Sequence, residues 1–147
     1  IAIGELFTHP AEWTTLVARR EVDFLRMHLS AMGGLTPARK AAILAEAFGV
    51  RTAWHGPPDQ SPVGHAACLH LDLASPNFGI REGGRFSEAL REVFPGCPET
   101  RHGRMYASGL PGLGVDFNEA AATAFPPNEA VTEWTQARRP DGSLNPP

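Results

Sequence analysis

The sequence is poor in the features that mark disulfide-rich, nucleic-acid-binding and membrane proteins. Its two cysteines, Cys68 and Cys97, are too few for a disulfide framework. Its 13 lysines and arginines are outnumbered by 16 acidic residues, so it has no basic footprint for nucleic acid. No apolar run approaches the roughly 20 residues of a membrane-spanning helix. We therefore expect a cytoplasmic protein with no nucleic-acid or membrane partner.

The remaining composition is that of a globular protein. The 147 residues are 42% apolar and 20% charged, and they are enough for one compact domain with one hydrophobic core. The chain opens on Ile1, inside an apparent strand and without a methionine. We expect the true N-terminus of the protein to lie upstream.

Strands and helices are predicted to alternate along the first 82 residues. Apolar runs predict strands over 1–4 (a buried one), 22–29, 50–54 and 78–81. Helices are predicted between them, each entered at a cap-plus-proline pair: Thr8 with Pro10, Thr36 with Pro37, and Ser61 with Pro62. Gly49 supplies the stop of the second helix. This repetition is typical of β/α units in a parallel sheet.

The number of units indicates an incomplete barrel. Three β/α units and a further strand make half of an eight-stranded barrel, and whole barrels take about 250 residues. We predict an α/β fold in which residues 1–82 form half of a (β/α) barrel. Residues 83–147 are rich in glycine, proline and charge, and we predict them to form an extension that wraps the barrel, with one helix at 86–94.

Ionisable residues stand at the ends of the predicted strands. Glu5, His55 and Glu82 follow the first, third and fourth strand, and Arg26 lies within the second. In α/β barrels the catalytic groups sit at the carboxyl ends of the strands and on the loops that follow. The stretch from 51 to 82 therefore predicts the rim of an active site.

These blocks resemble the mannonate dehydratase group of acid-sugar dehydratases in the enolase superfamily. The similarity covers nearly the whole chain in order and spacing. The matching strings are Ile3-Gly4-Glu5-Leu6-Phe7, Arg26, Gly33-Gly34-Leu35-Thr36-Pro37-Ala38-Arg39, Arg51-Thr52-Ala53-Trp54-His55-Gly56-Pro57, Asp59, Ser61-Pro62-Val63, His70-Leu71-Asp72-Leu73, Pro76-Asn77-Phe78-Gly79-Ile80, Glu82, Val93-Phe94-Pro95 and Pro111-Gly112-Leu113-Gly114.

The resemblance implies the C-terminal half of an enolase-type (β/α) barrel, with an N-terminal capping domain and one Mg²⁺ ion held by carboxylates at three successive strand ends. Glu5 would be the third metal ligand, and the other ligands, with a tyrosine and a histidine for acid/base work, would lie upstream. Arg26, His55, Asp59 and Glu82 match positions that line the substrate pocket, with His55 as the catalytic candidate. The full-length protein would be a homo-oligomer that binds a small sugar acid.

The dehydration of a sugar acid requires a metal ion and acid/base groups of this kind. Removing the proton beside a carboxylate creates an enediolate, which a hard cation with oxygen ligands stabilises, and loss of the 3-hydroxyl needs an acid within hydrogen-bond reach. Arg26 could clamp the carboxylate, while His55 and Asp59 could hold hydroxyls. We expect conversion of D-mannonate or D-gluconate to 2-keto-3-deoxy-gluconate, and an inactive isolated chain. The alternatives are a catalytically weak homologue with a sensing role and a racemase or epimerase.

Each of these residues also has an ordinary structural explanation. Arg26 could pair with Asp23 or Glu21, and Glu82 could orient a neighbouring arginine, Arg81 or Arg85. Glu5 could be a salt-bridge or capping residue, and His55 a packed one. Two places depart from the resembling family, Pro58 and the Gly83-Gly84 pair, and they bear on substrate preference.

Other candidates have weaker support. His65, Cys68 and His70 do not converge on one helix face, so a packed helix is favoured over a zinc site. Trp54 is predicted to pack in the barrel, and His28 to share the face of Arg26. Trp134 could close over the pocket, although packing is the favoured role.

Overall fold

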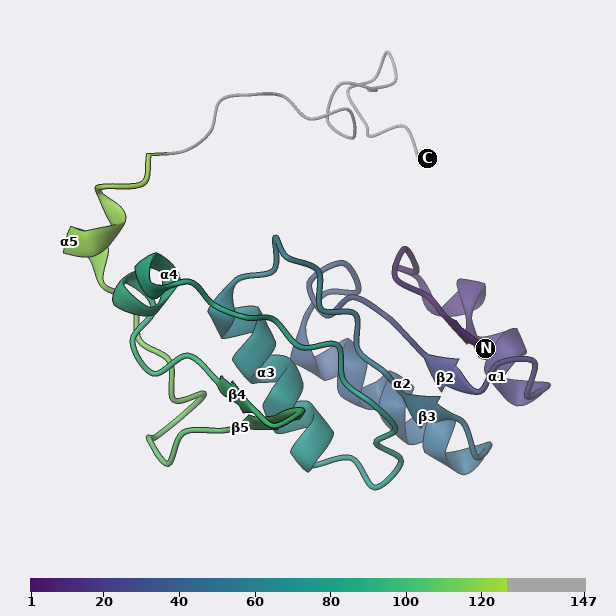
Figure 1. The fold of residues 1–147 in the computed structure, drawn as a ribbon. Coiled ribbons are helices and arrows are strands. Elements are labelled where there is room, and N and C mark those ends of the chain that lie inside the picture. Colours follow the sequence, from purple (N-terminus) through teal and green to yellow (C-terminus); the bar gives the residue numbers. More distant parts are fainter. Residues whose placement is uncertain (127–147) are drawn as a thin grey trace, which may run out of the picture.

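A short parallel sheet organises the N-terminal half of the chain. The computed structural model describes residues 1–126. Strands β1 (Ala2–Ile3), β2 (Phe24–Leu25) and β3 (Arg51–Thr52) lie side by side in that order, all parallel (Figure 1). The predicted alternation of strands and helices is therefore confirmed.

The regular strands are shorter than the sequence predicts. Backbone hydrogen bonds nevertheless continue past them, from Ala53 N to Leu25 O at 2.8 Å and from His55 N to Met27 O at 2.9 Å. The predicted fourth strand is reduced to one isolated bridge between Thr52 and Phe78. Within the described residues this segment has a neighbouring strand, β3, on one side only. Among these residues, its other edge therefore makes no hydrogen bonds that would stabilise a regular strand.

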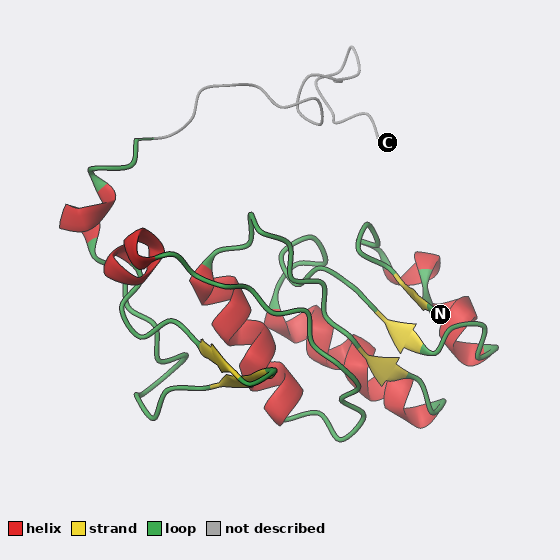
Figure 2. Ribbon diagram, viewed as in Figure 1, coloured by secondary structure: helices red, strands yellow, loops and turns green. Residues whose placement is uncertain are grey.

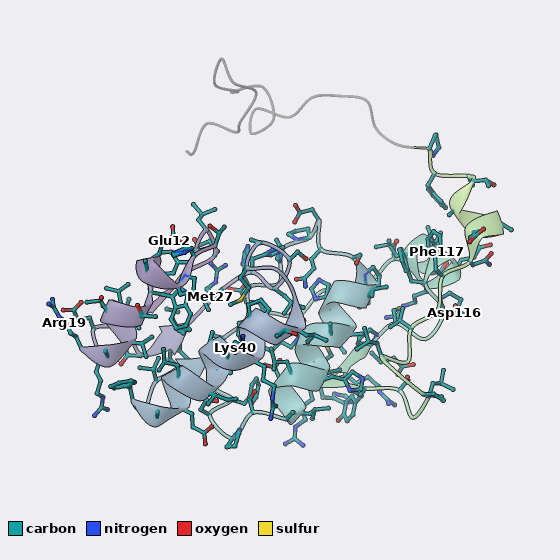
Figure 3. The ribbon with its side chains drawn as sticks, turned by 180° about the vertical axis from the view of Figure 1, so that it is seen from behind. Glu12, Arg19, Met27, Lys40, Asp116 and Phe117 are labelled. Atoms are coloured by element: carbon teal, nitrogen blue, oxygen red, sulfur yellow. The ribbon has the colours of Figure 1, made fainter. Side chains whose placement is uncertain are left out.

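The helices cover one side of these strands. Helices α2 (Leu35–Ala47) and α3 (Pro62–Leu73) run beside each other against the sheet, as Figures 2 and 3 show from opposite sides. The core between them contains large side chains that are at most 1% exposed, together with alanines of α2. The large ones are Leu25, Met27, Val50 and Trp54, so the packing role predicted for Trp54 is confirmed.

Helix boundaries follow local capping chemistry. Ser61 Oγ accepts a hydrogen bond from Gly64 N at 3.2 Å, and Gly49 has a φ of 71° just after α2, as predicted. The prediction of a Thr36 cap is wrong, because α2 begins at Leu35, so the cap position is Gly34, two residues earlier.

The first predicted helix is split in two. A short 3-10 turn, η1 (Pro10–Glu12), precedes α1 (Thr14–Ala18). The cap is His9 rather than Thr8, because His9 Nδ1 accepts a hydrogen bond from Ala11 N while Glu12 accepts from the backbone of Thr8 and His9. This reciprocal capping box closes the turn before the α-helix starts.

Burial of the first strand is not found. Ile1 is 76% exposed and Ile3 is 39% exposed. The physical reason is that β1 is the outer strand of this sheet and pairs only with β2. Phe78 and Ile80 are also exposed, at the other edge.

The segment after Glu82 contains more regular structure than predicted. Helix α4 (Glu88–Val93) confirms the predicted helix in shorter form, with Ser87 as its cap. It is followed by a hairpin of β4 (Glu99–Arg101) and β5 (Arg104–Tyr106), then α5 (Glu119–Ala122). The hairpin was missed, although the pair His102-Gly103, with positive φ at both residues, is a turn signal.

The described part of this segment ends near α4. In Figure 3, Phe117 lies against this helix, and its ring is 5.3 Å from that of Phe94. Trp134 and the predicted wrap over 127–147 fall outside the described residues. None of the helices described in residues 1–126 is long and apolar enough to cross a membrane.

Candidate functional site

Four of the five predicted site residues meet at the carboxyl edge of the sheet. Glu5 follows β1, Arg26 follows β2, His55 follows β3, and Glu82 ends the segment that bridges to β3. Because parallel strands bring their carboxyl ends to one edge, residues as far apart in the sequence as Arg26 and Glu82 come into contact. All four side chains are partly exposed, between 21% for His55 and 43% for Glu5.

Arg26 is the centre of this cluster. Its Nε and Nη2 donate to the two carboxylate oxygens of Glu82, the Nη2–Oε2 distance being 3.1 Å. Its Nη1 lies 3.0 Å from Oε2 of Glu5. The alternative pairing with Asp23 or Glu21 is not found, and Glu21 pairs with Arg19 instead. A bidentate arginine–carboxylate pair fixes both groups in one plane.

His55 joins the pair through one ring nitrogen. Its Nδ1 is 2.7 Å from Arg26 Nη2 and 2.8 Å from Glu82 Oε2. Protonated Nδ1 donates to Glu82, whereas unprotonated Nδ1 accepts from Arg26. Either way Nδ1 is engaged, and Nε2 is the nitrogen left to hold or transfer a proton for a ligand.

Hydrogen bonds keep Glu82 charged. Partial burial opposes the charged form, but the hydrogen bonds from Arg26, from the Gly56 N–H and from His55 outweigh it and lower the pKa of Glu82 to about 2. Sequence reasoning missed this use of the Gly56 backbone, at 3.1 Å. Glu82 does not orient Arg81 or Arg85; the Arg81 side chain pairs with Asp72 on the other side.

Glu5 and His28 complete the surroundings. A hydrogen bond from its own backbone N–H lowers the pKa of Glu5 against the opposing effect of burial, and Arg26 lowers it further. His28 lies edge-on to His55, with ring centroids 5.8 Å apart, as its shared face with Arg26 predicts. Burial and the charge of His55 lower the pKa of His28, while Asp59 opposes them.

Asp59 is the one predicted site residue outside the cluster. Its side chain is exposed on the turn before α3, and its effect on His28 is the only link to the site among the described residues. Its role in binding stays a prediction.

The charge of Glu82 should appear in the pH dependence of stability. Its pKa in the folded protein is about 2, below the ordinary value of 4.5. The stabilisation is therefore complete above pH 4.5 and is lost as the pH falls through 2. We expect the difference in the free energy of unfolding between the unsubstituted protein and the Glu82→Gln variant to decrease from pH 5 to pH 2, as measured by urea denaturation. A difference that stays constant over this range would contradict the prediction.

Gly56 packs against the backbone carbonyl group of Glu82. A Cβ atom on Gly56 would lie 2.5 Å from Glu82 O and 3.2 Å from Cε1 of His65. We expect Gly56→Ala to lower the free energy of unfolding by about 1–3 kcal/mol, measured by urea denaturation. Gly109→Ala is the matched control, because no atom lies within 4 Å of its Cβ position. Equal stabilities of the two variants would count against this packing argument.

Glu5 fits one position of a magnesium site. Its carboxylate offers the hard oxygen ligands that Mg²⁺ prefers, and it is accessible at the strand edge. Within residues 1–126, however, no three His, Cys, Asp or Glu side chains lie close enough together to hold an ion. Further ligands would have to come from outside the described residues. His65 and Cys68 are 1% and 0% exposed, which agrees with their predicted packed roles.

The sequences of known proteins are similar to this chain over almost its whole length. A D-galactonate dehydratase family member of Salmonella enteritidis is 53% identical over 147 residues, and one of Pantoea ananatis is 54% identical over 144. The chain covers 35% and 34% of their lengths, and 100% and 98% of the chain is matched. The chain therefore spans about a third of the length of these relatives.

Solved structures of related enzymes are also similar to this chain. A crystal structure of an enolase from Pantoea ananatis with bound D-gluconate and Mg matches with a TM-score of 0.88 and 53% identity, over 98% of this chain and 35% of that one. A mandelate racemase/muconate lactonizing enzyme from Jannaschia matches with a TM-score of 0.79 and 31% identity, over 89% and 33%. The family model for enolase C-terminal domain-like proteins matches residues 1–121. The chain therefore belongs to the enolase C-terminal domain-like family.

Proposed function

We propose that the full-length protein is a Mg²⁺-dependent sugar-acid dehydratase. The observation that carries the proposal is the Glu5–Arg26–His55–Glu82 cluster at the carboxyl ends of successive strands. Relatives at 50% identity and above are named as D-galactonate dehydratase family members, and a solved neighbour binds D-gluconate and Mg. These names support a sugar acid as the substrate class, and D-mannonate and D-gluconate are the substrates we propose.

In this proposal each described residue has a defined task. Arg26 is a cation held in place by two carboxylates, so it can bind an anionic or hydroxyl group without moving. His55 presents Nε2 for a proton at the sugar, since Nδ1 is engaged by Arg26 and Glu82. Bound Mg²⁺, with Glu5 as one ligand, would supply charge stabilisation for the enediolate.

We further propose that residues 1–82 are half of the catalytic barrel and residues 83–147 an extension on it, within a homo-oligomeric protein. Two open sheet edges with exposed apolar residues support the first part, because Ile1, Ile3, Phe78 and Ile80 need covering surface. The upstream half of the barrel would supply it, together with the remaining metal ligands and acid/base groups.

A panel assay tests the proposed function. The full-length protein with Mg²⁺ is incubated with D-mannonate, D-gluconate and D-galactonate, and formation of a 2-keto-3-deoxy acid is followed. Loss of water from any of these supports the dehydratase. Exchange of the α-proton for deuterium without loss of water indicates a racemase or epimerase. Binding without turnover or exchange indicates a sensing role, and either of the last two results overturns the dehydratase.

The isolated chain of 147 residues is expected to be inactive. Glu5 alone, among the described residues, cannot hold Mg²⁺ in competition with water, which requires several oxygen ligands. The same assay on the purified chain checks this, with the full-length protein as the positive control. Measurable dehydration by the chain alone would show that it is sufficient for catalysis.

A further inference from the structure

Three buried polar side chains form a second cluster behind the site. Arg81 Nη2 lies 3.0 Å from Nδ1 of His65 and 3.2 Å from the His65 carbonyl oxygen, and Nη1 lies 3.4 Å from Oδ2 of Asp72. The side chains of Arg81 and Asp72 are only 6% and 4% exposed. His65 and Asp72 lie two turns apart on α3, and the guanidinium group of Arg81 contacts both of them.

The backbone does not hold the end of the segment that carries Glu82. Gly79 N and Ile80 N both donate to Thr52 O, at 3.1 and 3.4 Å. Beyond them, no backbone–backbone hydrogen bond within residues 1–126 involves Arg81 or Glu82. The direction of the Glu82 side chain therefore depends on the contacts of the Arg81 and Glu82 side chains, which for Glu82 include the Gly56 N–H.

Arg81 and Glu82 make those contacts on opposite sides. Successive side chains of an extended segment point to opposite faces. Arg81 points to α3, whereas Glu82 points to Arg26 and His55 at the strand ends. Moving Arg81 away from α3 would let the segment turn and would withdraw Glu82 from Arg26.

His65 also supports the loops on both sides of the site. Its Cε1 would lie 3.2 Å from a Cβ on Gly56 and 3.4 Å from one on Gly84, so the ring packs close to both loop backbones. Burial and then the charge of Arg81 lower the pKa of His65 to about 4, so the ring is neutral and its Nδ1 accepts from Arg81. Burial raises the pKa of Asp72 to about 7, although Arg81 opposes this.

We propose that Arg81 is a positioning residue, clamped between His65 and Asp72 on α3, which fixes the Glu82 carboxylate against Arg26 and His55. Its side-chain hydrogen bonds within residues 1–126 go to His65 and Asp72. Its effect on turnover rests on the proposed function, but its effect on the position of Glu82 does not.

The test compares Arg81→Met with the control Arg85→Met in the full-length protein. Arg85 is exposed and only four positions away. We expect Arg81→Met to lower kcat/KM about 100-fold, in line with the cost of misplacing a site group by about 1 Å, and Arg85→Met to change it less than about twofold. A loss of folded protein alone would lower apparent kcat and leave KM unchanged, whereas a displaced Glu82 also raises KM.

A crystal structure of Arg81→Met gives the readout that does not depend on turnover. The proposal expects Glu82 to have left hydrogen-bond distance of Arg26 or His55 while α3 and the sheet are retained. Glu82 found in its original place would overturn it, even if activity were lost. If the parent proves inactive on every sugar acid, the proposed function fails, and the position of Glu82 still decides the role of Arg81.

If the Arg81→Met variant does not fold, the Arg81→Lys variant takes its place in the test. An ammonium group keeps the charge beside Asp72 but lacks the planar fork that reaches His65 at the same time. We expect a folded variant with kcat/KM lowered about tenfold and Glu82 displaced, whereas Arg85→Lys has no effect. Full activity with Glu82 unmoved in Arg81→Lys would contradict the clamp.

Discussion

Replacing Glu82 with glutamine in the full-length protein is expected to lower kcat/KM by about 100-fold. The carboxylate receives hydrogen bonds from Arg26 at both oxygens, from His55 and from the Gly56 N–H. Glutamine has one acceptor oxygen, and its NH₂ group would face an N–H of the Arg26 guanidinium in either orientation, and the Gly56 N–H as well in one of them. Arg26 and His55 would both lose the group that orients them.

The measurement is steady-state kinetics with the best aldonate of the panel. Glu92→Gln is the matched control, since Glu92 is exposed on the surface near the end of α4 and makes the same change of charge. Both variants should bind Mg²⁺ as the parent does, because Glu82 is not a proposed ligand. Activity of Glu82→Gln within about twofold of the control would show that the cluster has no part in turnover.

Glu5→Gln is expected to weaken Mg²⁺ binding by at least about 100-fold. Loss of an outer-shell partner of a metal ligand already costs about 10–100-fold in affinity, and a direct carboxylate ligand contributes its charge as well. Arg26 keeps its pair with Glu82 in this variant, so the rest of the cluster should remain in place.

Calorimetric titration of the metal-free full-length protein with Mg²⁺ checks this without reference to turnover. Glu21→Gln is the control, because Glu21 is exposed and pairs only loosely with Arg19, at 3.8 Å. Unchanged Mg²⁺ affinity in Glu5→Gln would remove Glu5 from the ligand set. Its role would then be limited to its ion pair with Arg26.

The two predicted effects separate the parts of the site. Glu82→Gln should damage turnover and spare metal binding, whereas Glu5→Gln should damage metal binding first. Arg26 contacts both carboxylates, so an effect of either variant on the other property would measure how strongly Arg26 couples them.

The sequence alone determined the order of elements and most of the site. Local signals such as Ser61-Pro62 and Gly49 depend on nearby backbone atoms, so they predict helix ends without tertiary information. The βα period then predicted that Glu5, His55 and Glu82 stand at strand ends and placed Arg26 within a strand, and the resemblance predicted the family that the comparisons confirm. The Thr8 cap was wrong because the His9 side chain accepts the hydrogen bond from the Ala11 N–H, while Glu12 accepts from the Thr8 and His9 N–H groups.

The tertiary structure decided the pairings and the exposures. From the sequence, Arg26 had nearby acidic partners in Glu21 and Asp23, but its partners are 21 and 56 positions away. Such contacts depend on which strands lie side by side. The exposure of Ile1 and Ile3 depends on the edge position of β1, and the clamp of Arg81 between His65 and Asp72 on the packing of α3. Local pattern fixes where a residue lies on its own element, whereas its partners are set by the three-dimensional neighbours of that element.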